Sequence, residues 1–257
     1  MGKNTLKLTL DNWYKKICTA GFIKDDPVQF PRRYKRQEDK EIAVFLTATI
    51  AWGKRDLILR SAEKMFALMG ESPFDFIMSD GHKKLKNNNI HRTFFESDLK
   101  YFCCGFKYCY NKYGKLESLF SLSGAQTKEK DVWQGIKLFR EKMAFANKGV
   151  YSKHISNPGE EGGNGSACKR LNLALRWLVR GAPVDLKLWK SLSAKDLYIP
   201  LDIHVARTAR SLGLLQRGSN DKKAVIELTE KLREFCPEDP VKYDFALFGA
   251  GVNNLNG

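Results

Sequence analysis

Apolar residues recur three and four positions apart along most of this 257-residue chain, the spacing that gathers them on one face of an α-helix. The longest such stretch, DKEIAVFLTATIAWGKRDLILRSAEKMFALMG (39–70), opens with acidic residues and ends at a glycine. Gly53 interrupts it, so we expect two helices or one kinked helix. Residues 94–114, 131–147 and 166–181 also show helical spacing. Because the sequence contains no convincing pair of strands joined by a hairpin turn, it predicts an all-α fold.

The N-terminal segment leaves two interpretations open. Leu6, Leu10 and Trp13 follow helical spacing, but Leu6, Leu8 and Leu10 also alternate as they would in a short strand. The segment lacks the apolar core and the small-residue cleavage site of a signal peptide. No apolar run approaches the roughly 18 residues that span a bilayer. We therefore expect a cytoplasmic protein without a membrane partner.

The charge balance points to a polyanionic partner. The chain has 44 Lys and Arg residues against 29 Asp and Glu residues, a formal net charge of +15. Solubility alone needs a net charge of only about 2 to 8 in a small domain. Such an excess favours nucleic acid as the partner, although it does not distinguish DNA from RNA.

The cysteines do not predict a metal centre. The chain has six of them, without a C-x-x-C pair and without the spacing of a zinc or iron–sulfur site. We interpret them as reduced thiols, mostly in the core, and predict no metal and no cofactor.

Two loops interrupt the helical pattern. Residues 25–40 are punctuated by prolines, and residues 156–166 are rich in glycine. Each is either a solvated surface loop or part of a binding site. The first loop carries four basic residues in five positions, namely Arg32, Arg33, Lys35 and Arg36.

The second loop leads into a helix with a lysine in its first turn. Ser166 is a suitable N-cap and Gly181 marks the end, which puts Lys169 at the third helical position. The positive end of the helix dipole disfavours an ammonium there by about 0.3–1 kcal/mol, which favours a free amine able to attack carbon. The alternative is a lysine that contacts phosphate or is merely solvated.

Asp202 has two possible roles. In IPLDIHVARTARSLGLL (199–215) it stands where a helix N-cap is expected, and capping alone would account for it. A capping carboxylate is also held rigidly and kept ionised by the backbone N–H groups that it accepts. Beside the amine of Lys169, it would suit a reaction that passes through a cationic intermediate.

Two motifs carry a resemblance to a known superfamily. GGNGSACKR, which contains Lys169, and PLDIHVARTARSLGL, which contains Asp202, resemble the helix–hairpin–helix DNA glycosylases. Those enzymes place a lysine at the start of a helix after a glycine-rich hairpin, then an aspartate in a V/L-D-x-H-V-x-R segment. The 33-residue separation is closest to that of the archaeal 8-oxoguanine glycosylases. Nearly the whole chain is also similar to a bacterial family catalogued as a domain of unknown function, through DKEIAVFLTATIAWGKRD, SACKRLNLALRWLVR, YIPLDIHVARTARSLGLL and EDPVKYDFALFGAGV.

The glycosylase resemblance implies one compact helical unit over residues 1–257, built from two interleaved subdomains. Their cleft would be lined mainly by residues 41–60 and 160–215. The resemblance implies a monomeric enzyme without a cofactor that removes a damaged base, such as an oxidised guanine, from duplex DNA. The amine of Lys169 would attack C1′ to form a Schiff base, and Asp202 would stabilise the developing oxocarbenium ion at a distance of about 8 Å or less. The predicted DNA contacts are Lys54, Arg176, Arg180, Arg207 and Arg210.

A base pocket would involve Trp52 and Asp244. Trp52 could stack on an extruded base, or it could pack in the core. Asp244 follows Asp239, the expected cap of a last helix, and could be a polar group of the pocket or a packed residue.

Two departures favour another class of function. The L-P-G-V-G hairpin of the superfamily is absent, and Trp52, Gly53 and Lys54 stand where a polar Gln or Asn is expected. The alternative is a non-catalytic nucleic-acid-binding protein on the same fold. An RNA-processing or tRNA-binding protein is a third possibility, which rests on net charge alone.

Overall fold

The chain is almost entirely helical in the computed structural model, which describes residues 2–122, 132–160 and 162–253. Two short strands, β1 (Asn89–His91) and β2 (Phe94–Phe95), pair antiparallel. The helices are α1 (Lys3–Ile17), α2 (Gln37–Thr49), α3 (Arg55–Met69), α4 (Pro73–Met78), α5 (Glu96–Tyr113), α6 (Glu117–Leu122), α7 (Val132–Ala146), α8 (Lys169–Val179), α9 (Ile203–Ser211), α10 (Lys222–Arg233) and α11 (Tyr243–Asn253). Single 3₁₀ turns are η1 (Ala20–Asp25), η2 (Pro27–Gln29), η3 (Pro31–Arg33), η4 (Gly81–Lys84), η5 (Ala194–Asp196) and η6 (Pro240–Lys242).

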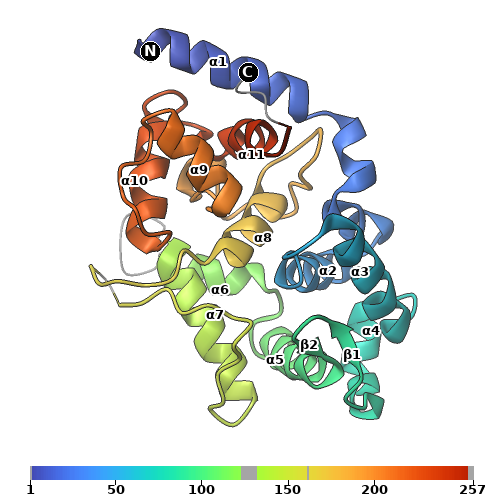
Figure 1. Cartoon of the computed structure of the whole chain (residues 1–257). Coiled ribbons are helices and arrows are strands. Elements are labelled where there is room, and N and C mark those ends of the chain that lie inside the picture. Colours follow the sequence, from blue (N-terminus) through green and yellow to red (C-terminus); the bar gives the residue numbers. More distant parts are fainter. Residues whose placement is uncertain (1, 123–131, 161, 254–257) are drawn as a thin grey trace. The chain divides into compact units, whose positions relative to one another are not determined.

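The chain folds into two compact units whose segments interleave (Figure 1). Unit 1 combines Met1–Phe22, Asn157–Lys187 and Leu192–Gly257, and it contains α1 and α8 to α11. Unit 2 combines Ile23–Ser156 with the short segment Leu188–Ser191, and it contains α2 to α7. The helical content agrees with the all-α fold expected from the sequence.

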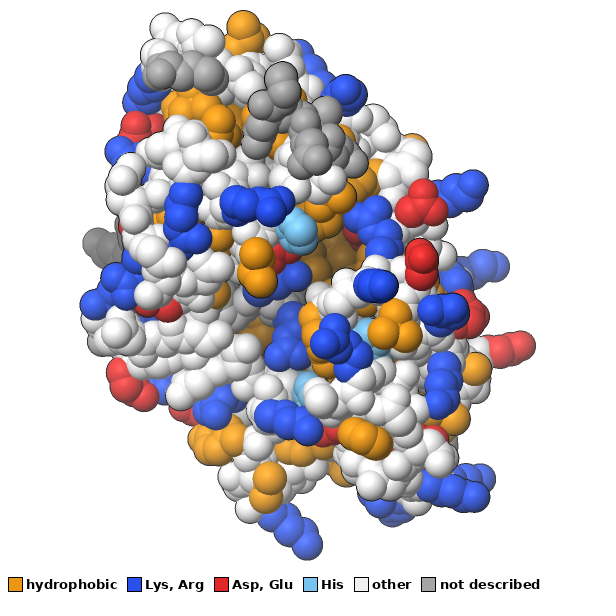
Figure 2. All heavy atoms as spheres, viewed as in Figure 1, with side chains coloured by type: hydrophobic (Ala, Val, Ile, Leu, Met, Phe, Trp, Pro, Cys, Tyr) orange, Lys and Arg blue, Asp and Glu red, His pale blue; other side chains and the backbone are white. Residues whose placement is uncertain are grey.

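Basic side chains are spread widely over the face of the molecule shown in Figure 2, where acidic side chains are sparser. This distribution accords with the net charge of +15. Among the described helices, none is both long enough and apolar enough to cross a membrane.

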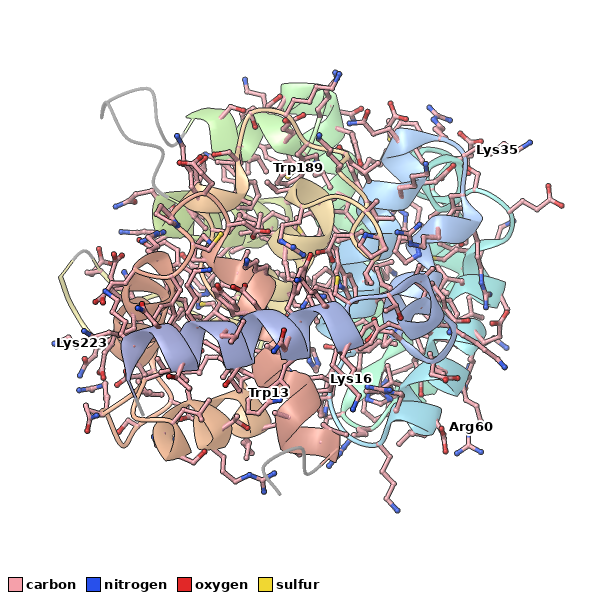
Figure 3. All side chains as sticks on the ribbon, turned by 90° about the horizontal axis from the view of Figure 1, so that it is seen from above. Trp13, Lys16, Lys35, Arg60, Trp189 and Lys223 are labelled. Carbon is pink, nitrogen blue, oxygen red and sulfur yellow. The ribbon has the colours of Figure 1, made fainter. Side chains whose placement is uncertain are left out.

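The core of unit 2 is built around α2, in which every residue from Glu41 to Thr49 is buried. Phe45 of α2 stacks on Phe139 of α7 with ring centroids 4.9 Å apart. Trp189, labelled in Figure 3, is 1% exposed and donates its indole N–H to the Glu41 carboxylate at 2.8 Å. The hydroxyl of Tyr110 donates to the other oxygen of that carboxylate at 2.9 Å. Trp189 therefore ties the returning segment to α2, while burial raises the pKa of Glu41.

Unit 1 is held together by close helix packing on both sides of α11. Helix α1, on which Figure 3 labels Trp13 and Lys16, packs against α11, and α11 packs against α9. A Cβ on Gly249 would lie 2.6 Å from the Ile17 side chain of α1, so a larger residue would require Ile17 to move. On the other side, a Cβ on Gly251 would lie 2.8 Å from Thr208 of α9. Small residues on α11 therefore let three helices approach closely.

The helices agree with the sequence predictions, and one local feature differs. The stretch 39–70 forms two helices separated near Gly53, whose φ is +99°, and the N-terminal segment is a helix rather than a strand. The β1–β2 pair was not predicted, because its strands are too short to show an alternating pattern.

Candidate functional site

The loop before α8 has a fixed course because its two sides touch through glycines. A Cβ on Gly159 would lie 2.1 Å from the carbonyl oxygen of Asn164, and one on Gly165 would lie 2.0 Å from that of Pro158. Any larger residue at either position would force the backbone apart. The glycine-rich sequence is therefore a structural requirement in this part of the chain and not merely a sign of a solvated loop.

The end of this loop is anchored to the start of α10. Ser166 forms an isolated antiparallel bridge with Asp221. The backbone N–H of Lys222 donates to the carbonyl of Gly165 at 2.9 Å. These contacts, made across more than fifty residues of sequence, set the direction in which the chain enters α8.

The start of α8 corrects the predicted register of this helix. Cys168 is the N-cap residue and has a left-handed conformation with φ of +45°, so Lys169 is the first helical residue and not the third. Ser166, the predicted cap, accepts a hydrogen bond from the backbone N–H of Cys168 at 3.3 Å, outside the helix. The reversal at Cys168 follows from the anchored loop, which the helical spacing could not reveal. Lys169 thus stands at the very beginning of the helix.

Lys169 and Asp202 lie together in unit 1. The Lys169 Nζ is 3.5 Å from the Asp202 Oδ2, and the two side chains are 33% and 13% exposed. The other oxygen of Asp202 caps α9 by accepting the backbone N–H of Val205 at 2.8 Å. The distance confirms the prediction that the two groups lie within about 8 Å. Asp202 therefore serves as a cap and faces the amine at the same time.

Two predicted DNA contacts are buried, Arg176 on α8 and Arg180 at the C-cap that follows this helix. Arg176 is 4% exposed and pairs with Asp244, and its Nε lies 3.4 Å from Asp185. Arg180 is 6% exposed and donates to both oxygens of Asp239 and to Asp185. These guanidinium groups pair with carboxylates in the core of unit 1. They are not on the surface, where the predicted contacts with DNA phosphates would require them to be.

Asp244 belongs to the surroundings of the lysine–aspartate pair. It is 5% exposed, and burial raises its pKa to about 6, with Arg176 opposing that change. The negative charge of Asp202 raises the pKa further and the positive charge of Lys169 lowers it. Asp244 therefore interacts electrostatically with both members of the pair and with Arg176.

The remaining predicted contacts in unit 1 are on α9. Arg207 is exposed and donates to the carbonyl of Gly251 at 2.8 Å. Arg210 is half-buried and donates to the carbonyls of residues 217–218, which fixes the turn before α10. Arg207 therefore has the more accessible side chain of the two.

Trp52 and Lys54 lie in unit 2, at the junction of α2 and α3. The Trp52 ring is half-buried, stacks on His154 at 5.8 Å and meets His91 edge-on at 4.6 Å. The backbone carbonyl of Trp52 also lies 2.9 Å from the Nε2 of His91. Lys54 is exposed at the start of α3. Trp52 is thus fixed between two imidazoles, which accords with a packing role and leaves part of the indole accessible.

Fold and site together define a basic, helical protein. Its anchored, glycine-rich loop leads into a helix whose first residue, Lys169, lies beside the capping carboxylate of Asp202. The chain belongs to the family described as "Protein of unknown function (DUF2400)", whose profile matches residues 26–253. This match confirms the expected membership of an uncharacterised domain family. No curated protein and no solved structure matches the chain.

Sequence reasoning missed the carboxylates that pair with Arg176 and Arg180. Asp185 follows α8 in the segment GAPVD, and Asp239 was recognised only as a cap. No local signal indicated these partners, because helical spacing puts Arg176 on the side of the helix away from the apolar stripe, where an exposed cation is expected.

Proposed function

We propose that the protein is a DNA glycosylase with lyase activity at abasic sites and that its reaction centre is the Lys169–Asp202 pair. The observation that carries the proposal is the 3.5 Å approach of a first-turn lysine to a carboxylate whose other oxygen is occupied in a helix cap. A partly exposed amine beside a fixed negative charge is suited to a nucleophilic attack through a cationic transition state.

The chemistry follows from the two groups. The amine of Lys169 attacks C1′ of the deoxyribose while the bond from C1′ to the base breaks, and the bonding electrons leave with the base. Asp202 stabilises the positive charge that develops at the sugar ring. The attack requires an unprotonated amine, and Asp202, 3.5 Å away, is positioned to accept that proton before it passes to the departing base. Opening of the sugar ring, in which the amine proton passes to O4′, gives a Schiff base. Loss of a C2′ proton to water then forms a C2′–C3′ double bond and expels the 3′ phosphate, which cleaves the strand.

Duplex DNA with a damaged base, such as an oxidised guanine, is the proposed substrate. The net charge of +15 supports a polyanionic partner, and the choice of lesion comes from the resemblance to the 8-oxoguanine glycosylases. Arg207 and Lys54, both exposed, are the proposed phosphate contacts. Arg210 and the accessible part of Trp52 are further candidates. We leave Arg176 and Arg180 out of the contact surface because both are buried.

Covalent trapping with borohydride tests the proposal. Incubation of the protein with duplex DNA that carries an oxidised, deaminated or abasic site should give a stable protein–DNA adduct on reduction. Lys169→Ala should abolish the adduct, because no amine remains at the site. Asp202→Asn retains the shape of the cap but removes the charge, and we expect trapping to slow by about 10²-fold or more. Lys223→Ala, at an exposed lysine of α10, is the matched control and should trap like the wild-type protein.

Two results would contradict the assignment in different ways. An adduct that persists in Lys169→Ala would move the nucleophile to another amine. If the wild-type protein traps on none of these substrates and binds damaged and intact duplex equally, the glycosylase proposal is wrong.

The second candidate function is nucleic-acid binding without catalysis. The ion pair between Lys169 and Asp202 favours it, because a lysine 3.5 Å from a capping carboxylate can serve the fold without taking part in a reaction. Competition between duplex DNA, single-stranded DNA and RNA at a stated salt concentration would rank the partners for either function.

A further inference from the structure

Unit 2 displays an unusual group of apolar side chains where α7 ends. Phe145 is 66% exposed, Val150 is 62% exposed and Tyr151 is 51% exposed. Lys148 and Lys153 are exposed in the same segment. We call these five residues the α7-end surface. Figure 2 shows hydrophobic and basic side chains beside one another at this end of the molecule. Exposed large apolar residues that gather in one region, here within residues 145–151, commonly mark a binding surface.

The backbone that presents this surface is fixed by hydrogen bonds. The N–H of Gly149 donates to the carbonyl of Ala144 at 2.8 Å, and that of Val150 donates to the carbonyl of Asn147 at 3.1 Å. The side-chain amide of Asn147 donates to the carbonyls of Met143 and Tyr101, at 2.8 and 3.1 Å. The hydrogen bonds therefore fix the backbone from which these side chains project into water. Leaving apolar side chains in water is unfavourable, and the stability of the fold does not require it here.

Both aromatic rings are supported on one side. The Phe145 ring lies 5.2 Å from the ring of Tyr108 on α5. The guanidinium of Arg140 lies 3.9 Å above the Tyr151 ring and is fixed by a hydrogen bond from its Nε to the carbonyl of Ile155 at 3.3 Å. Phe145 is 66% exposed and Tyr151 is 51% exposed, so the side of each ring that has no neighbour in the protein is accessible to a stacking partner.

The charge of the segment selects the kind of partner. Residues 137–153 contain five Lys and Arg residues and one acidic residue, Glu141. A second copy of the chain would bring the same excess of positive charge against this surface, which opposes self-association. Nucleotides supply both complementary parts, a flat apolar base and a negative phosphate. In a duplex the bases are already stacked, so unpaired nucleotides fit best.

We propose that the α7-end surface binds single-stranded or locally unpaired nucleic acid, with bases stacked on Phe145 and Tyr151 and phosphates bound by Lys148 and Lys153. This site is separate from Lys169 and Asp202, which lie in unit 1, and it does not depend on the glycosylase proposal. Through this surface the protein would bind a nucleic-acid strand whether or not the strand contains a damaged base.

Fluorescence anisotropy with a labelled oligothymidylate of about twelve nucleotides, within the usual length of such sites, tests this proposal. Phe145→Ala/Tyr151→Ala should weaken binding at least tenfold, because each stacked base contributes about five- to 150-fold in affinity. Lys148→Asn/Lys153→Gln removes two charges, and Asn tolerates the left-handed backbone at residue 148, where φ is +58°. It should reduce the slope of log affinity against log salt by about 1.4.

A matched variant tests the specificity of this site. Leu8→Ala, at a leucine of α1 that is 62% exposed, should bind the oligonucleotide like the wild-type protein. All of the substituted side chains on the α7-end surface are exposed, so an unchanged melting temperature is expected and verifies the fold. Wild-type affinity in Phe145→Ala/Tyr151→Ala would overturn the proposal. So would a loss confined to binding of anionic lipid vesicles or to self-association, with oligonucleotide affinity intact.

Discussion

Replacing Arg180 by methionine tests whether unit 1 depends on its buried charges. The guanidinium donates to both oxygens of Asp239 at 2.8 to 3.0 Å and to Asp185 at 2.5 Å. Methionine retains most of the volume and the apolar stem of arginine but supplies no positive charge. The substitution therefore removes the charge contacts with little loss of packing.

The expected loss of stability comes mainly from Asp185. Its side chain is 0% exposed, and it would keep Arg176, whose Nε is 3.4 Å away, but lose the closer arginine. Removing one partner of a buried ion pair typically costs about 3–5 kcal/mol. Asp239 is 27% exposed, so water can replace part of what it loses, and it still caps η6 through Lys242. We expect Arg180→Met to lower the free energy of unfolding by about 3–5 kcal/mol, a large part of the roughly 5–15 kcal/mol of a typical domain.

Urea unfolding at pH 7, followed by circular dichroism, measures this change as a shift in midpoint at constant slope. Arg180→Met/Asp185→Leu is the informative second variant, because removing both charges relieves the uncompensated carboxylate. It should be more stable than Arg180→Met alone. A single variant within about 1 kcal/mol of wild type, or a double variant that is less stable than the single one, would refute the reasoning.

Two further predictions concern pH and the glycine-rich loop. Burial would raise the pKa of Asp11, but hydrogen bonds from two lysines and Tyr243 outweigh it and lower that pKa from 3.8 to about 2. This stabilisation is complete above pH 3.8 and disappears as the pH falls towards 2, so Asp11→Asn should lose less stability than wild type over that interval in acid titrations of unfolding. Gly165→Ala should open the loop, increase its cleavage by protease and abolish trapping at Lys169, because its Cβ would lie 2.0 Å from a backbone oxygen. Gly163→Ala, whose Cβ would have no neighbour closer than 3.4 Å, is the control, and equal protease sensitivity of the two variants would contradict this account.

The helices could be predicted because their signals are local. The apolar spacing of residues 39–70 and the break near Gly53 are properties of neighbouring positions, and the structure has α2 and α3 there. The same is true of the Asp202 cap, since its hydrogen-bond partner is Val205. The family resemblance brought Lys169 and Asp202 together, which helical spacing could not have done.

The parts that could not be predicted depend on contacts between distant positions. The left-handed Cys168 follows from the anchoring of residue 165 to residue 222, so the sequence around α8 suggested Ser166 as the cap instead. Arg176 was interpreted as a surface cation because its partner Asp244 is 68 residues away. Charge at one position in a sequence does not reveal whether a carboxylate will meet it in the core.

The interleaved order of the chain has a consequence for synthesis. Helix α1 is made first, but its packing partner α11 begins at Tyr243. At about 5–20 residues per second, α1 waits roughly 10–45 s after leaving the ribosome before that partner exists. Most of unit 2 is translated during this interval and can assemble in order of emergence, apart from the indole of Trp189. Lys169 and Asp202 belong to unit 1, so the surroundings of this pair are complete only after α11 has been made.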